Sequence, residues 1–249
     1  MPYVVHDGIR IHYQVAGDGP PLVLQHGLTQ SIEDWEECGY VAALAPAYRL
    51  IMIDARGHGR SDRPHGEADY DVARRVGDVV AVLDALGIGR AHFWGYSMGA
   101  FIGYGMARHA PERLDRLVIG GSHPFPRDPE GNRGWLRAAL PGGSAMVAAI
   151  ERIVGPVSPA WATRLAAGDV AAWIAAVPAG PGMEEMLAAM TIPCFAYAGT
   201  EDPLFAPTQS GAARIAGAEF LALPGLGHMP AFTDSAAILP AVMRFLAAG

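Results

Sequence analysis

The stretch "WGYSMGAFIGYG", residues 94–105, contains Gly95-Tyr96-Ser97-Met98-Gly99, a Gly-x-Ser-x-Gly pattern. A strand-like apolar run, "AHFW", precedes the pattern, and the helix-like "MGAFIGYGMARHA" follows it. In a tight strand-to-helix turn, side chains two residues before and after the serine would collide with the strand and the helix, so glycine suits both positions. The context therefore predicts that Ser97 lies at a sharp turn above a sheet, with its hydroxyl at a helix N-terminus.

Apolar runs and helical patterns alternate along the rest of the chain. Two short strands are expected on either side of the Asp7-Gly8 turn, in residues 3–8 and 9–17. The remaining strand-like runs are apolar without strict alternation, which is typical of strands covered on both faces, and they span residues 20–27, 48–59, 91–97, 114–122, 193–202 and 218–229. Helices are expected over residues 71–86, 98–110 and 235–247, the last despite Pro240. This order predicts an α/β fold with a mostly parallel central sheet flanked by helices.

Residues 126–190 interrupt this alternation. They contain no convincing strand, are rich in Ala, Gly and Pro, and hold three of the five tryptophans of the chain, Trp135, Trp161 and Trp173. Tryptophans in such a segment indicate burial, so we expect an inserted helical cap. The predicted domains are a core of residues 1–125 and 191–249 and a cap of residues 126–190.

A serine hydroxyl becomes a strong nucleophile only when a base accepts its proton. Asp202, in the turn after the run "PCFAYAGTE", fits the acid that orients the base, with Glu201 as its neighbour and competitor. His228, in "LPGLGHMP" after the final strand, fits the base, and His123 is a weaker alternative. The predicted catalytic residues are Ser97, Asp202 and His228, in the chain order of serine, acid and histidine.

The negative charge that develops on the substrate oxygen needs hydrogen-bond donors. The backbone N–H of Met98, directly after the serine, and that of Leu28, directly after "QHG", are the expected oxyanion-hole donors. We expect His26 to orient this loop and to take no part in proton transfer.

The chain resembles the α/β-hydrolase superfamily over essentially its whole length. The resemblance rests on "HGLTQSIEDW" (26–35), "IDARGHGRSDRP" (53–64), "GYSMGA" (95–100), "GTEDP" (199–203) and "GLGHMP" (225–230). It implies an α/β-hydrolase fold and a chemistry similar to that of small serine esterases and enol-lactone hydrolases, through an acyl-enzyme on Ser97. It implies no organic cofactor and no metal. Epoxide hydrolases and haloalkane dehalogenases of this fold use an aspartate nucleophile, so Ser97 disfavours those activities.

The leading functional expectation is a serine hydrolase that cleaves a carboxylic ester or lactone of a small to medium, mostly apolar substrate. A carbon–carbon bond hydrolase is the nearest alternative, and it would need a cation for the substrate acid, which Arg127, Arg133, Arg137 or Arg152 could supply. A perhydrolase or acyltransferase would use the same residues, and a non-catalytic ligand receptor is a further alternative. The side chains expected to line the substrate pocket are those of Thr29, Trp35, Tyr96, Phe125, Trp135 and Met186.

The bulk composition is that of a globular protein with an acidic surface. The 249 residues carry a formal net charge of −7, which argues against nucleic acid and anionic membranes as partners. No signal peptide or transmembrane segment is recognisable, so a cytoplasmic protein that acts on a small molecule is expected. Cys38 and Cys194 are expected to be free thiols, and the oligomeric state stays open.

Overall fold

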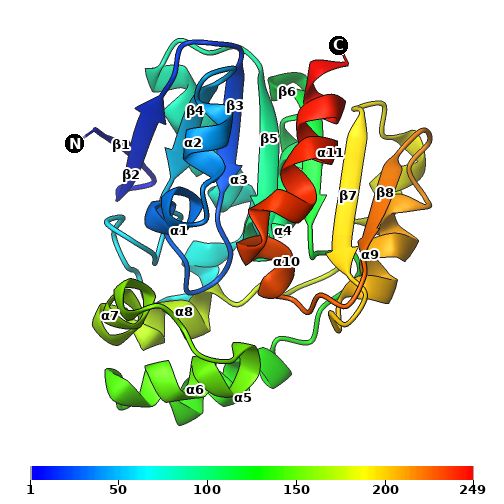
Figure 1. The fold of residues 1–249 in the computed structure, drawn as a ribbon. Helices are drawn as coiled ribbons and strands as arrows, with labels where there is room; N and C mark the ends of the chain where they lie inside the picture. The colour runs from blue at the N-terminus through cyan, green and yellow to red at the C-terminus, as the bar shows by residue number, and fades with distance from the viewer. Residues whose placement is uncertain (1, 249) are drawn as a thin grey trace.

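The computed structural model describes residues 2–248. Its centre is an eight-stranded sheet with the strand order β1-β2-β4-β3-β5-β6-β7-β8 (Figure 1). β1 pairs antiparallel with β2, and β2 pairs antiparallel with β4. The strands β3, β4, β5, β6, β7 and β8 are parallel to one another. The predicted α/β fold with a mostly parallel sheet is confirmed. The strands span Tyr3–His6, Ile9–Ala16, Pro21–Gln25, Arg49–Ile53, Ala91–Tyr96, Leu114–Gly120, Cys194–Gly199 and Glu219–Leu223.

The three longest helices of the sheet layers, α3, α4 and α11, form where the sequence predicts them. α3 spans Val72–Ala85, and the Asp71 side chain caps its start by accepting from the Ala73 N–H at 2.8 Å. α4 spans Met98–His109 and ends before Pro111, while α11 spans Ser235–Ala247 and contains Pro240. The shorter helices of these layers are α1 (Ile32–Glu37), α2 (Tyr40–Leu44), α9 (Phe205–Ala212) and α10 (Pro230–Thr233).

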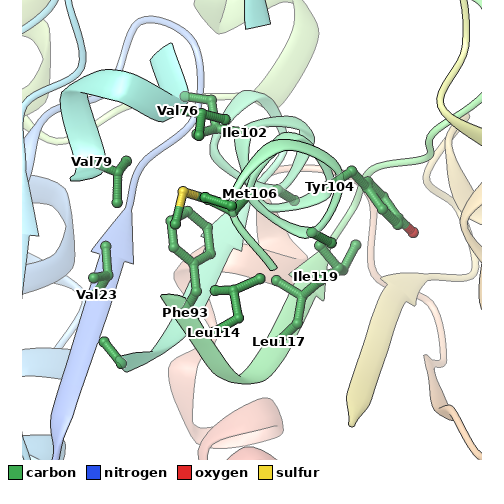
Figure 2. Close-up of a cluster of buried hydrophobic side chains, with 14 of the residues drawn as sticks. Val23, Val76, Val79, Phe93, Ile102, Tyr104, Met106, Leu114, Leu117 and Ile119 are labelled. Carbon is green, nitrogen blue, oxygen red and sulfur yellow. The ribbon is translucent and has the colours of Figure 1, made fainter. Parts of the chain in front are cut away.

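Two apolar cores lie on opposite faces of the sheet. On one face, side chains of α3 and α4 pack against β3, β5 and β6; Figure 2 shows Val76, Val79, Ile102 and Met106 of the two helices around Phe93 of β5. On the other face, α1, α2, α10 and α11 cover the strands, and Figure 1 shows α11 lying across them. The sheet is therefore buried on both sides, as its continuous apolar runs predict.

Four helices, which we call the cap, lie between β6 and β7 in the sequence. They are α5 (Glu130–Ala138), α6 (Ser144–Val154), α7 (Pro159–Ala167) and α8 (Val170–Ala176), and Figure 1 shows them grouped at one end of the sheet. The cap has its own apolar cluster, in which Trp161 and Trp173 are buried and Trp135 is half-buried. Ion pairs join the cap to the core: Arg133 contacts Glu67 at 2.9 Å, and Arg164 contacts Asp34 at 3.0 Å.

Trp35, which was expected to line a substrate pocket, lies in the core instead. Its side chain is 0% exposed, and its ring meets those of Tyr40, Trp94 and Phe232 edge to face at 4.8–5.7 Å. The helical register of α1 turns this residue inward, towards the sheet, because Ile32 and Trp35 share one face of the helix.

We predict that Trp35→Phe lowers the free energy of unfolding by about 1–3 kcal/mol, because the smaller ring leaves a void beside its three aromatic neighbours. Urea denaturation followed by circular dichroism measures the change. Ile153→Ala is the control, since Ile153 is 59% exposed and its truncation should change the stability by less than about 0.5 kcal/mol. Equal effects of the two substitutions would contradict the core position of Trp35.

Candidate active site

Ser97 occupies a sharp turn between β5 and α4. Its backbone has φ 52° and ψ −110°, a conformation that L-residues rarely adopt. A Cβ on Gly95 would overlap the Gly99 carbonyl, and a Cβ on Gly99 would overlap the Gln25 carbonyl. The two glycines therefore let strand and helix approach closely enough to hold Ser97 in this strained conformation.

The structure brings Ser97, His228 and Asp202 into one hydrogen-bonded line. His228 Nε2 lies 2.9 Å from Ser97 Oγ, and His228 Nδ1 lies 2.7 Å from Asp202 Oδ2. The second oxygen of Asp202 accepts the Leu204 N–H at 2.8 Å, and the Asp202 side chain is fully buried. Because the carboxylate accepts from Nδ1, it leaves Nε2 free to accept a proton from Ser97. Glu201, the sequence competitor of Asp202, is exposed.

Tyr96 lies beneath this line of side chains, although the sequence suggested that it lines the pocket. It is 0% exposed, its hydroxyl donates to the backbone carbonyl of His228, and its ring centroid lies 5.3 Å from the imidazole. A Cβ on Gly121, at the end of β6, would lie 3.1 Å from His228 Cε1 and 3.0 Å from the Tyr96 hydroxyl. Glycine at this position leaves the space that the imidazole and the phenol occupy.

The loop after β3 is held by a network of buried polar groups. His26 Nε2 accepts the Ala55 N–H at 3.1 Å and its Nδ1 donates to the Gly27 carbonyl at 2.7 Å, so both ring nitrogens are used. The Gln30 side-chain oxygen accepts the Gly27 N–H at 2.8 Å. These bonds support the expectation that His26 orients the loop, and they identify Gln30 as a residue that sequence reasoning missed.

Two buried carboxylates, those of Asp34 and Asp54, accept hydrogen bonds from backbone N–H groups of the same loop. Asp34 Oδ2 accepts the Ser31 N–H at 2.8 Å, and Asp54 accepts the Ile32 N–H at 3.0 Å and His12 Nδ1 at 2.8 Å. Burial opposes the charge of Asp54, but the bond from His12 and the backbone donors hold the pKa of Asp54 below its usual range. The position of Asp54 directly after β4 was the only sequence signal for this role.

Leu28 and Met98 come together beside Ser97. Leu28 packs against a small cluster that contains Met98, Ala175 and Ala176. A Cβ placed on the neighbouring Gly27 would lie 3.4 Å from Ser97 Cβ. Neither the Leu28 N–H nor the Met98 N–H donates to another backbone group within residues 2–248. Both N–H groups are therefore free to bind a ligand oxygen, and the N-terminus of α4 favours a negative charge there.

The other residues expected in the pocket are dispersed. Thr29, with φ 66°, faces a cavity between the loop and the cap. Trp135 packs on the cap core. The ring of Phe125 stacks with that of His123 at 5.7 Å, and the Arg214 guanidinium lies over it at 4.8 Å. Met186 borders a separate cavity together with Ala107 and Pro111 at the far end of α4, so it does not reach Ser97. Met186 belongs to a 3₁₀ helix, η3 (Glu184–Ala189), that sequence reasoning did not identify. The position of this helix places the Met186 side chain at that cavity.

The four arginines considered for a substrate acid differ in their partners. Arg133 and Arg137 both contact Glu130, at 3.3 and 2.7 Å, and Arg152 donates to the Ala148 carbonyl. Arg127 donates to Ser122 Oγ at 2.9 Å and to the His123 carbonyl at 2.6 Å, and its guanidinium lies over the Phe101 ring. Carboxylates of the protein thus already pair with two of the four.

Within residues 2–248, no group of three or more His, Cys, Asp or Glu side chains could hold a metal ion. None of the helices described there is long and apolar enough to cross a membrane.

Comparison with known proteins identifies the family. A sequence model of the alpha/beta hydrolase fold family matches residues 20–174, and the chain belongs to this family. Epoxide hydrolase 3 from Siraitia grosvenorii is 33% identical over 124 residues, which cover 49% of this chain and 39% of that protein. The match to the curated relatives thus spans less than half of their length.

Solved structures resemble the chain over nearly its whole length. The enol-lactonase from Burkholderia xenovorans LB400 superposes with a TM-score of 0.85 at 26% identity and covers 98% of this chain and 99% of its own. An esterase from Rhodococcus sp. ECU1013 superposes with a TM-score of 0.82 at 29% identity and covers 99% and 98%. The chain is therefore a member of the α/β-hydrolase superfamily, and its structural neighbours include an enol-lactonase and an esterase.

The buried His58 beside the loop yields a prediction about pH. Burial and the nearby His26 lower the pKa of His58 well below its ordinary value of 6.5, so the folded protein keeps it neutral while the unfolded chain protonates it in mild acid. Stability is therefore lost as the pH falls below about 6.5. We predict that His58→Gln reduces the loss of unfolding free energy between pH 7 and pH 5 by up to about 2 kcal/mol.

Urea unfolding at the two pH values measures this difference. His109→Gln is the matched control, because His109 is exposed at the end of α4. An equal loss of stability in wild type and His58→Gln would contradict the prediction.

Proposed function

We propose that the protein is a serine hydrolase that cleaves carboxylic esters or lactones of small to medium size through an acyl-enzyme. The observation that carries the proposal is the continuous line from Ser97 Oγ through His228 to the buried Asp202, with hydrogen bonds of 2.9 and 2.7 Å. The likeness to an enol-lactonase and to an esterase supports the same reaction class.

In the proposed reaction Ser97 Oγ attacks the carbonyl carbon of the substrate while His228 Nε2 takes the hydroxyl proton. Asp202 keeps the proton on Nδ1 and stabilises the imidazolium that forms. The tetrahedral intermediate collapses when His228 gives its proton to the leaving oxygen. The alcohol of an ester then departs, whereas that of a lactone stays attached as a hydroxyl group of the acyl-enzyme. Water then attacks the acyl-enzyme by the same steps, and the carboxylic acid leaves Ser97.

The N–H groups of Leu28 and Met98 are the proposed oxyanion-hole donors. Each such donor typically contributes about 3 kcal/mol of transition-state stabilisation. The network of His26, Gln30 and Asp54 supports this role, because it fixes the loop before a substrate binds. Preorganised donors cost no reorganisation during the reaction.

A compact substrate is favoured by the cap of residues 126–190, which is short and rich in Ala and Gly and offers little length for an acyl groove. For the carbon–carbon hydrolase alternative, Glu130 already engages two of the four candidate arginines, Arg133 and Arg137. Arg127 and Arg152 bond to Ser122 and to backbone carbonyls, so they remain the candidates for binding a substrate acid. Perhydrolysis or acyl transfer would differ only in the molecule that attacks the acyl-enzyme.

We predict that Ser97→Ala folds normally and loses p-nitrophenyl butyrate hydrolysis by at least about 10³-fold, because the covalent step is removed. Steady-state kinetics measure the loss, and circular dichroism checks the fold. Ser210→Ala, at an exposed serine of α9, is the control and should keep wild-type kinetics. Turnover by the Ser97 variant close to that of wild type would refute the mechanism.

Among linear p-nitrophenyl esters we predict that kcat/KM is highest for acyl chains from acetate to hexanoate and falls towards palmitate. The short, Ala- and Gly-rich cap limits the apolar area that a chain can bury, and each additional methylene contributes only while it is buried, at about 0.8 kcal/mol. The series from acetate to palmitate measures this profile below the critical micelle concentration of each ester. A maximum at the longest chain would contradict the proposed substrate size.

A further inference from the structure

The cap contacts the side chain of Leu28, the residue that carries one of the two proposed oxyanion donors. Leu28 packs against the apolar cluster of the cap and against Ala175 and Ala176 of α8. Its backbone belongs to the loop after β3, which lies outside the cap. The position of the Leu28 N–H therefore depends on how this loop and the cap are held together.

Leu28 lies in a tight turn whose backbone is strained. The Gln30 N–H donates to the Gly27 carbonyl at 3.3 Å, so Leu28 and Thr29 occupy the two central positions of the turn. Thr29 has φ 66°, a conformation that a β-branched residue rarely adopts. Strain of this kind persists only where the surrounding structure holds it.

A cavity adjoins one side of this turn. Its volume is about 150 Å³, and it is bordered by Thr29, Gln30 and His58 and, in the cap, by Arg164 and Trp173. Because the cavity borders Thr29, close packing does not hold the turn on that side. The hydrogen bonds at the two ends of the turn must hold it instead.

One buried carboxylate holds the end of the turn. Asp34 Oδ2 accepts the Ser31 N–H at 2.8 Å and the Ser31 hydroxyl at 3.1 Å, and Ser31 directly follows Gln30. Asp34 Oδ1 accepts from Arg164 Nη2 at 3.0 Å. The two oxygens of a single side chain thus join the loop to α7 of the cap, which lies below α1 in Figure 1.

Arg164 keeps this carboxylate ionised and in place. Asp34 is 5% exposed, and burial raises the pKa of Asp34 above its usual range, while the positive charge of Arg164 opposes that rise. An ionised carboxylate accepts stronger hydrogen bonds than a neutral group. The guanidinium is itself fixed, because it also donates to both oxygens of Glu37 in α1.

A second arginine joins the cap to the core without reaching the loop after β3. Arg133 of α5 contacts Glu67 at 2.9 Å, and the Glu67 side chain is 62% exposed. Glu67 begins a short 3₁₀ helix before α3, η1 (Glu67–Tyr70). Anchoring of the cap and positioning of the loop can therefore be separated by experiment.

We propose that Arg164 is a positioning residue for the Leu28 oxyanion donor. Through Asp34 and Ser31 it holds the turn of residues 27–30 in the conformation that binds the oxyanion. The proposal rests on the proposed function. Because Arg164 acts through Asp34 and not on the substrate, its loss weakens binding of the oxyanion and leaves binding of the uncharged substrate unchanged.

Arg164→Gln tests this role by removing the charge and keeping a polar side chain. We expect kcat for p-nitrophenyl butyrate to fall about tenfold with KM within about twofold of wild type, because acylation and deacylation both pass through an oxyanion. The loss is smaller than the roughly 10²–10³-fold caused by removal of a donor, since the Leu28 N–H is displaced and not removed. Arg133→Gln is the matched control and should keep wild-type kinetics.

A pair of ketone inhibitors separates positioning from a loss of folded protein. Ser97 Oγ adds to the carbonyl carbon of n-butyl trifluoromethyl ketone, the serine proton passes to His228, and the carbonyl oxygen becomes an oxyanion. The corresponding n-butyl methyl ketone binds without this step. In Arg164→Gln we expect the Ki of the trifluoromethyl ketone to rise about tenfold, by the factor that kcat/KM loses, and the Ki of the methyl ketone to stay within about twofold. A smaller fraction of folded enzyme would lower kcat and leave both Ki values unchanged.

Asp34→Asn tests the link between Arg164 and the loop, and it replaces Arg164→Gln if circular dichroism shows that the arginine variant does not fold. We expect the same rise in the Ki of the trifluoromethyl ketone. The variant with both substitutions should lose no more than about twofold beyond the larger single loss, because both break the same chain of bonds. Losses that multiply would show that the two residues act independently and would overturn the proposal.

The remaining outcomes separate this proposal from the proposed function. Wild-type kinetics in Arg164→Gln, a fall in kcat with an unchanged Ki of the trifluoromethyl ketone, or an equal loss in Arg133→Gln would overturn the positioning role and leave the serine hydrolase intact. Absence of ester hydrolysis that depends on Ser97 in the wild-type protein would instead refute the proposed function, and the positioning role with it.

Discussion

The close approach of β5 and α4 at Ser97 is the constraint on which the rest of the site depends. Gly95 and Gly99 have no Cβ, so the strand, the helix and the Gln25 carbonyl can pack where any other residue would overlap. This packing holds Ser97 at φ 52° and presents its hydroxyl at the start of a helix. Strain of this kind costs about 1–3 kcal/mol and persists only because the two cores around the sheet fix both elements.

The remaining site groups reach Ser97 through contacts between segments that are distant in sequence. Tyr96 bonds the backbone of His228, which fixes the imidazole from beneath. Asp34 accepts from Ser31 in the loop after β3 and also pairs with Arg164 of the cap. The loop that carries Leu28 is therefore joined by charge-assisted bonds to the cap, so cap position and loop geometry are physically coupled.

The fold and the Ser97, Asp202 and His228 assignments could be argued from the sequence because each has a local signal. Glycine spacing marks Ser97, and strand-end positions mark Asp202 and His228. The pocket lacked such a signal. Trp35 and Tyr96 are aromatic residues beside site motifs, yet the register of α1 and the direction of β5 turn both into the core. Met186 lies at the end of α4 that is far from Ser97. Its position was missed because no sequence motif marks the path of residues 184–189.

The sequence by itself determined the strand and helix order, the turn at Ser97 and the chain order of serine, acid and histidine, because periodicity and glycine requirements act over a few residues. Only the tertiary structure decided which side chains surround the serine. The cavity of Gln30, His58, Arg164 and Trp173 combines two loops and two cap helices. These four residues come together only because segments that lie more than a hundred positions apart in the chain pack against one another.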